Sequence, residues 1–310
     1  MAAIKIGIVG VGKIVRDQHL PVLDGHKAFE LVAAASRNAV VAGVENFTSL
    51  SDMLRACPQL DAVALCMPPQ VRHESARIAL SAGKHVLLEK PPGATLAEID
   101  DLRALAKSAS LSLYATWHSR HAPMVEAAKL FLSDAELRAV EIVWKEDVRH
   151  WHPGQDWIWR PGGFGVFDPG INALSIATHI LPRPIVLKRS RLSFPENRAA
   201  PIAARLSFRD TAGIAVEADF DWRQTGPQIW GIVCETDKGR LCLSHGGARL
   251  RIGDFERPGA PEAEYRTIYD RFAAMVREGR SDVDLRPMQL VADAFLLAEH
   301  RKVEAFHDAR

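Results

Sequence analysis

Residues 4–15 read IKIGIVGVGKIV, an apolar strand that runs into two glycines and then into the start of a helix. Short apolar runs alternate with amphipathic stretches as far as residue 116. This alternation is typical of βαβ units, in which helices cover both faces of a parallel sheet. The pattern predicts an α/β fold with a doubly wound parallel sheet, whose ligands bind beyond the carboxyl ends of the strands. The candidate strands are 4–9, 31–35, 62–67, 85–88 and 111–116.

Two helix ends in this half are marked by short motifs. Thr95 and Glu98 have the spacing of a capping box, which predicts a helix that begins there and reaches about Lys107. Gly83 follows the helical stretch 72–82, where a glycine suits the left-handed residue just past a helix end.

After about residue 120 the pattern changes to strands joined by turn sequences, with helices expected at 122–132 and 172–179. A last helix is expected from Pro287 to about Phe306. We therefore predict a first domain at 1–120 and an α+β domain at 121–310 with a large, mostly antiparallel open sheet. The last helix could pack back on the first domain. The candidate strands of the second domain are 140–144, 185–192, 202–208, 214–222, 230–236 and 240–243.

The composition excludes several classes of protein. With 47% apolar and 25% charged residues among 310, the chain is not disordered. The 39 basic and 38 acidic residues leave a net charge of +1, which predicts neither a nucleic-acid nor a membrane partner. The four cysteines lack metal-ligand spacing, so no metal site is expected. We predict a cytoplasmic protein that forms a homodimer or homotetramer through the sheet of its second domain.

The glycine turn predicts a Rossmann nucleotide-binding site in the first domain. Gly10 permits the tight turn, and Gly12 lets the backbone approach a pyrophosphate, with Lys13 and Ile14 beside it. Val15 stands where the motif has its third glycine, and a plain strand-to-helix turn is the alternative. Because residues 36 and 37 are Ser36 and Arg37 rather than an acidic residue, we expect NADP to be preferred and NAD to be accepted, unless Arg37 is only a solvated surface residue.

Three further motifs extend over most of the chain. They are CMPP at 66–69, AGKHVLLEKP at 82–91 and GGFGVFDPGIN at 162–172. Together with the glycine turn they resemble the glucose-fructose oxidoreductase, inositol dehydrogenase and rhizopine-catabolism (Gfo/Idh/MocA) family. The blocks 10–21, 115–120, 144–153 and 167–175 are similar to the bacterial aldose 1-dehydrogenases of that family that act on D-galactose or L-arabinose.

The resemblance implies two catalytic residues. Lys90 would reach the substrate oxygen beside the nicotinamide, and Asp168 matches the catalytic aspartate of the family. Position 172 usually holds a proton-accepting histidine, but this chain has Asn172, which cannot take a proton near neutral pH. We therefore expect Asp168, aided by Lys90, to act as the base and Asn172 to orient the substrate. The alternatives are a solvated lysine and a helix-capping aspartate.

The remaining candidates line the two ligands. His118 follows the last strand of the first domain and could face the cleft, with a buried histidine as the alternative. The resemblance implies substrate contacts from Glu146, Trp151 and Trp230, whose carboxylate and aromatic faces suit a sugar, with core packing as the alternative for the tryptophans. Trp157 and Trp159 could border the nicotinamide or fill the domain junction. The cofactor-binding set expected from the resemblance is Gly10, Gly12, Lys13, Ile14, Ser36, Arg37, Cys66, Met67, Pro68, His73, Glu89 and Lys90.

The expected function is an NAD(P)-dependent aldose 1-dehydrogenase that oxidises the anomeric carbon of D-galactose, L-arabinose or both to the lactone. Another sugar or polyol dehydrogenase of the family would be expected to carry a histidine at position 172. A non-catalytic NAD(P)-binding regulator need not retain Lys90 and Asp168, and both are present.

Overall fold

The computed structural model describes residues 2–259, 261 and 263–307. The chain divides into two compact units, of which unit 1 is Met1–His118 with Tyr265–Asp284 and unit 2 is Ser119–Glu264 with Leu285–Arg310. The chain therefore first passes from unit 1 to unit 2 after His118, two residues before the expected domain boundary at residue 120. The segment 265–284, expected in the second domain, belongs to unit 1.

Unit 1 is built on a parallel sheet of six strands among its described residues, in the order β3-β2-β1-β4-β5-β6. This order reverses beside β1, which places a ligand-binding crevice at the carboxyl end of that strand. The doubly wound α/β prediction is thus confirmed, and the short edge strand β3 is an addition to it. The strands are β1 Ile4–Val9, β2 Phe29–Ala35, β3 Glu45–Phe47, β4 Ala62–Leu65, β5 His85–Leu88 and β6 Leu113–Ala115.

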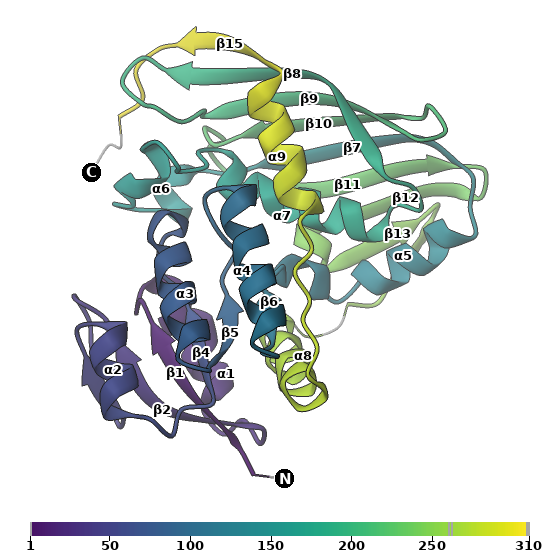
Figure 1. The fold of residues 1–310 in the computed structure, drawn as a ribbon. Coiled ribbons are helices and arrows are strands. Elements are labelled where there is room, and N and C mark those ends of the chain that lie inside the picture. Colours follow the sequence, from purple (N-terminus) through teal and green to yellow (C-terminus); the bar gives the residue numbers. More distant parts are fainter. Residues whose placement is uncertain (1, 260, 262, 308–310) are drawn as a thin grey trace. The chain divides into compact units, whose positions relative to one another are not determined.

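Helices cover both faces of this sheet (Figure 1). The capping box at Thr95 and Glu98 is confirmed, and Gly83 has the expected positive φ of 73° after α3. A helix that the sequence analysis did not identify, α8 (Glu264–Glu278), packs on the face of the sheet to which β1 contributes Ile4, Ile6 and Ile8. The other helical segments of unit 1 are η1 Val15–His19, α1 Leu20–Leu23, α2 Leu50–Ala56, η2 Pro69–Val71, α3 Arg72–Ser81 and α4 Leu96–Ser108.

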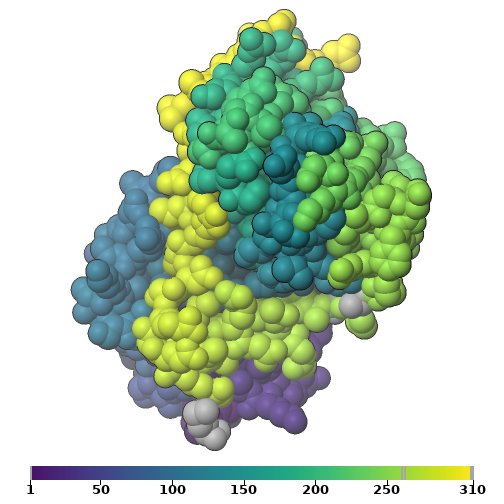
Figure 2. Space-filling view, turned by 90° about the vertical axis from the view of Figure 1, so that its right-hand side faces the viewer, coloured from purple at the N-terminus to yellow at the C-terminus, as the bar shows by residue number. Residues whose placement is uncertain are grey.

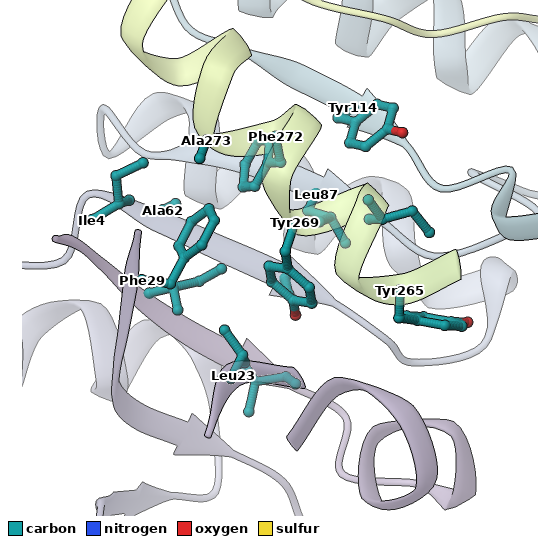
Figure 3. Packing of buried hydrophobic residues seen from close by; sticks show 14 of the residues in the cluster. Ile4, Leu23, Phe29, Ala62, Leu87, Tyr114, Tyr265, Tyr269, Phe272 and Ala273 are labelled. Carbon is teal, nitrogen blue, oxygen red and sulfur yellow. The ribbon is translucent and has the colours of Figure 1, made fainter. Parts of the chain in front are cut away.

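One face of α8 is apolar because Tyr265, Ile268, Tyr269 and Phe272 recur at helical spacing, and each is at most 4% exposed. Figure 3 shows Tyr269 and Phe272 projecting from the helix toward Phe29. In Figure 2 the yellow-green atoms of α8 lie against purple atoms of the N-terminal segment. A segment late in the sequence thus completes the hydrophobic core on one face of the six-stranded sheet.

Unit 2 contains a sheet of nine strands among its described residues, in the order β14-β13-β12-β11-β7-β10-β9-β8-β15. The pairs β7–β10 and β8–β15 are parallel and the others antiparallel, which confirms the mostly antiparallel prediction. The strands are β7 Leu137–Lys145, β8 Ile185–Pro195, β9 Ala203–Asp210, β10 Ala215–Asp221, β11 Ile229–Thr236, β12 Gly239–Ser244, β13 Arg249–Ile252, β14 Phe255–Arg257 and β15 Ala298–Val303.

Helices α5 (Val125–Ser133), α7 (Phe167–Ile180) and α9 (Arg286–Leu296) pack against this sheet (Figure 1). The prediction of a last helix as far as Phe306 is wrong. The helix ends at Leu296, and residues 298–303 form the edge strand β15 beside β8. Helix α9 packs on α7 and β8 and so belongs to unit 2. The late segment that packs on the first sheet is therefore α8 and not the last helix.

Two chain-wide features complete the fold. Cys57, Cys66, Cys234 and Cys242 are all free thiols. Among the described residues, no helix combines the length and the apolar character needed to cross a membrane.

Candidate functional site

The glycine turn after β1 is closely covered by the loop after β4. Gly10 has a φ of +87°, and a Cβ atom on it would lie 2.7 Å from the backbone nitrogen of Met67. The amide of Cys66 also donates to the carbonyl of Val9 at 2.8 Å. A side chain at position 10 would therefore separate the two loops that frame the predicted nucleotide site.

The space beside the Cα atom of Gly12 is empty, whereas that beside Gly10 is filled by the loop after β4. A Cβ atom on Gly12 would meet no atom within 4 Å, so its backbone can be approached from outside, as a pyrophosphate requires. The residues present therefore fit a dinucleotide. Beside this turn, Val15 is fully buried in the core, Ile14 packs partly against it, and Lys13 is exposed and paired with Asp17.

The end of β2 carries no carboxylate at residues 36–38. The amide of Ser36 donates to the carbonyl of Phe47 at 2.9 Å, which ties the turn to β3. Arg37 is exposed. His73 of α3, in contrast, lies 2.8 Å from Asp101 of α4, so its ring already has a partner within unit 1, and a nucleotide contact from His73 stays a prediction.

Glu89, at the end of β5, is the centre of a buried network. Its side chain is 4% exposed, and Oε1 accepts hydrogen bonds from His19 Nε2 at 3.1 Å and from the Tyr265 hydroxyl at 2.8 Å. Burial alone would raise the pKa of Glu89, but the hydrogen bond and charge of His19, with smaller contributions from His118 and Tyr265, lower it to about 2. Glu89 is therefore an anion at any ordinary pH.

His19 is fully buried and is the counter-ion of Glu89. Burial favours its neutral form, whereas the Cys66 sulfur, Tyr269 and Glu89 favour the cation, and the net effect raises the pKa of His19 well above its usual value. Its Nδ1 atom lies 2.8 Å from the Tyr269 hydroxyl. The ion pair is thus enclosed by two tyrosines of α8.

Lys90 follows this network directly and is half-buried. Its amide donates to Oε2 of Glu89 at 2.8 Å, and the peptide bond to Pro91 is cis. His118 stacks on Tyr265 with ring centroids 5.5 Å apart. Unit 1 therefore brings together three residues that the sequence analysis selected, namely Glu89, Lys90 and His118.

Two buried carboxylates of unit 2 lie just after β7 and in α7. Glu146 follows β7 and is 3% exposed, and its two oxygens accept hydrogen bonds from the indole nitrogens of Trp222 at 3.2 Å and Trp230 at 2.9 Å. Asp168 lies in the first turn of α7 and is also 3% exposed. Both are therefore buried carboxylates held by neighbouring polar groups.

A glycine fixes where α7 begins. Gly165 has a φ of +52°, and a Cβ atom on it would lie 2.3 Å from the carbonyl oxygen of Pro201. The cap of α7 is Val166, so Asp168 is not the capping residue that the alternative interpretation required. Asn172 follows one turn later on the same helix and is half-buried.

Tryptophans form the wall beside Glu146. Trp230 stacks on Trp144 at 5.8 Å and lies 5.1 Å from Trp151 of the short helix α6 (Val148–Trp151), measured between ring centroids. Trp159, which follows in η4 (Asp156–Trp159), is 4% exposed and packs on Trp222 at 5.2 Å. Trp230 therefore binds the carboxylate and packs on Trp151, whereas Trp159 is a core residue.

The sequence analysis missed His152. Its Nε2 atom lies 3.7 Å from Oε1 of Glu146 and 3.5 Å from Oδ2 of Asp168, so it connects the two carboxylates. The only sequence signal was its place in the block 144–153, where it follows Trp151. Two carboxylates, an imidazole and aromatic faces can bind a polyhydroxylated ligand and accept a proton from it.

Comparison with known proteins identifies the family of the first domain and relatives of the whole chain. Residues 4–116 match the model of the Gfo/Idh/MocA oxidoreductase family, described as an NAD-binding Rossmann fold. Galactose 1-dehydrogenase from Pseudomonas fluorescens is 44% identical over 308 residues, which cover 99% of this chain and 100% of that protein.

Two solved structures extend the comparison. D-galactose-1-dehydrogenase from Rhizobium etli has a TM-score of 0.94 and 59% sequence identity, with 99% of each chain covered. A 3-ketoreductase from Actinomadura kijaniata, solved with NADP and TDP-benzene, has a TM-score of 0.85 at 21% identity, covering 97% of this chain and 100% of its own. The second likeness concerns the fold alone.

Proposed function

The chain belongs to the Gfo/Idh/MocA oxidoreductase family, and on that premise we propose that it oxidises D-galactose at C1 to the lactone with NADP or NAD as the hydride acceptor. The carboxylate cluster around Asp168 and Glu146 carries this proposal, because it combines proton acceptors with a tryptophan wall suited to a sugar. The full-length likeness to two galactose dehydrogenases supports the choice of substrate.

The reaction removes a hydride from C1 and a proton from the C1 hydroxyl, so that the C–O bond becomes a carbonyl. The oxidised nicotinamide, when bound, supplies the electrophile that takes the hydride. In this proposal Asp168, aided by Lys90, takes the hydroxyl proton. The buried position of Asp168 keeps competing water away from its carboxylate.

The other site residues orient the sugar. Glu146 accepts hydrogen bonds from ring hydroxyls, and the faces of Trp151 and Trp230 pack on the apolar C–H side of the ring. Asn172 can donate and accept through its amide, which suits a hydroxyl but not proton removal. L-arabinose has the same ring configuration without the hydroxymethyl group at C5, so we propose it as a second substrate.

We propose that NADP is preferred over NAD. The end of β2 lacks the carboxylate that would bind a ribose 2′-hydroxyl and repel a 2′-phosphate, whereas Ser36 and Arg37 can hydrogen-bond and neutralise that phosphate. Gly10, Gly12 and residues 66–68 would hold the remainder of the dinucleotide, and His73 is proposed as a further contact.

We propose that the protein forms a homo-oligomer through the face of the nine-stranded sheet that points away from α7. That face carries charges of both signs, as in Arg205 and Asp219, around a groove of about 150 Å³. Mixed charges allow the same surface on two copies to be complementary. The groove is lined by Lys145, Arg191, Ser193, Ala203, Ala204, Arg205, Asp219, Asp221 and Arg223.

The test is an initial-rate assay of the purified protein with NADP or NAD against D-galactose, L-arabinose, D-glucose and myo-inositol, following the absorbance of the reduced nicotinamide. D-galactose should give the highest kcat/KM. Lys90→Met and Asp168→Asn should each lower kcat by about 10² to 10⁴ while the protein stays folded. Lys107→Met, on the exposed side of α4, is the matched control. Oxidation of inositol but of no aldose, or normal turnover in both variants, would contradict the proposal.

A further inference from the structure

We propose that Arg72 is a positioning residue, which fixes the turn that carries Lys90 and ties it to the loop of the nucleotide site. This inference rests on the role proposed above for Lys90. Arg72 is the first residue of α3 and is 2% exposed, which is unusual for an arginine. A buried guanidinium is costly unless its donors are satisfied, so its partners indicate what it holds.

The partners of Arg72 are main-chain carbonyls on either side of Lys90. Its Nη1 atom donates to the carbonyl oxygens of Glu89 and Pro91. The amide of Lys90 itself is bound by the Glu89 carboxylate at 2.8 Å. The backbone polar groups of consecutive residues in this turn are thus held by buried charged side chains, which leaves the turn little freedom to move.

The same guanidinium reaches the nucleotide loop. Its Nη2 atom donates to the carbonyl oxygen of Met67. Met67 lies against the glycine turn, where a Cβ atom on Gly10 would come within 2.7 Å of its backbone nitrogen. Arg72 therefore links the loop expected to contact the dinucleotide with the turn expected to contact the substrate oxygen.

Arginine suits this position better than other residues. Its planar guanidinium presents five donors in a fixed geometry, so it can bind carbonyls of two separate loops at once. Lysine has one ammonium on a flexible stem and cannot span the same carbonyls. Arg72→Lys keeps the positive charge and removes the fixed geometry, which makes it the decisive substitution.

The test is a double-mutant cycle with Arg72→Lys, Lys90→Met and the two combined, measured as kcat with saturating nucleotide and sugar. Arg72→Lys alone should lower kcat about tenfold or more, the order of loss expected from a misplaced catalytic group. The Kd for NADP, measured by tryptophan fluorescence, should change less than threefold. In the Lys90→Met background, Arg72→Lys should change kcat less than twofold, because its effect acts through Lys90. Arg103→Lys, an exposed arginine of α4, is the control and should behave as the wild type.

Independent losses that multiply in the combined variant would overturn the proposal, as would an unchanged kcat in Arg72→Lys. If Arg72→Lys and Arg72→Gln both fail to fold while Arg103→Lys folds, Arg72 is a stability residue and the positioning role is wrong.

A second readout does not depend on any substrate. With saturating NADP, the rate at which an amine-reactive ester labels Lys90, followed by mass spectrometry, should change at least threefold in Arg72→Lys, whereas labelling of Lys107 should not. An unchanged rate at Lys90 contradicts the positioning role. Failure to oxidise any aldose, with the labelling change observed, would instead remove the proposed function and leave the link between Arg72 and Lys90 intact.

Discussion

The Nε2 atom of His152 lies 3.5 Å from Oδ2 of Asp168 and 3.7 Å from Oε1 of Glu146. One imidazole thus faces two carboxylates that are each 3% exposed. The ring is therefore within reach of both carboxyl groups and helps to hold the two side chains in place. His152 therefore belongs to the candidate site although it was not among the residues predicted from the sequence.

Replacement of His152 should impair the reaction more than the fold. His152→Gln keeps an amide donor but removes the ring that lies near both carboxyl groups, so we expect kcat/KM for D-galactose to fall about tenfold or more, the size of effect produced when a buried polar group loses its partner. His179→Gln, which removes a histidine paired with Glu126 elsewhere in unit 2, is the control. Equal kcat/KM in the two variants would exclude His152 from the site.

The His19–Glu89 pair should make stability depend on pH. The pKa of Glu89 is lowered to about 2, so the stability it contributes is present above pH 4.5, its unfolded value, and is lost as the pH falls toward 2. The pKa of His19 is raised, so its contribution is present below pH 6.5 and is lost as the pH rises through the higher folded value.

The gap in unfolding free energy between the wild type and Glu89→Gln should therefore be widest between about pH 4.5 and 6.5, and should reach about 2 kcal/mol or more. Urea unfolding at a series of pH values measures it. Glu74→Gln, an exposed residue of α3, should show no such gap. A gap that does not vary with pH would mean that the pair is not charged in the folded protein.

Cofactor preference should depend on Arg37. Arg37→Ser removes the guanidinium expected to neutralise the 2′-phosphate, so KM for NADP should rise about tenfold while KM for NAD stays within twofold. The comparison is Arg55→Ser, an exposed arginine of α2. Equal changes in KM for NADP and NAD would show that Arg37 does not contact the 2′-phosphate.

Self-association should depend on the outer sheet face. Arg205→Glu reverses a charge on a side chain that is 73% exposed, and it should shift the sedimentation profile toward monomer if two copies meet at this face. Arg103→Glu, on α4, should not. A wild-type protein that sediments as a monomer would remove this proposal.

The features that the sequence predicted correctly have local causes. The tight turn at Gly10, the capping box at Thr95 and Glu98 and the glycine at 83 each act within a few residues, so their geometry follows from the local sequence. The parallel sheet follows from the repeated alternation of strand and helix patterns. The second sheet was predicted as a class, and its strand order was not, because that order depends on long-range pairing.

Two errors concern segments whose place is set by distant partners. Helix α8 carries a clear apolar spacing from Tyr265 to Phe272, so the helix itself was predictable, but its return to unit 1 depends on Phe29 and Glu89. Strand β15 is polar and largely exposed, and only its pairing with β8 makes it a strand. Because its own residues show no strand pattern, the predicted last helix was extended through β15.

The buried polar residues were the least predictable part of the site. His152 and Arg72 have no spacing motif, and each is placed by a contact with a residue of a later element that the local sequence does not predict: Asp168 for His152 and the carbonyl of Glu89 for Arg72. Lys90, Glu146 and Asp168 were found through a family resemblance rather than through periodicity.

The most direct test of the central claim uses D-galactose carrying deuterium at C1 with the purified protein and NADP. The account predicts that the reduced nicotinamide contains one deuterium for each lactone formed, as mass spectrometry would show, and that Asp168→Asn slows this transfer. Turnover that leaves the deuterium on the sugar, or no turnover of D-galactose by the folded protein with either nucleotide, would contradict it.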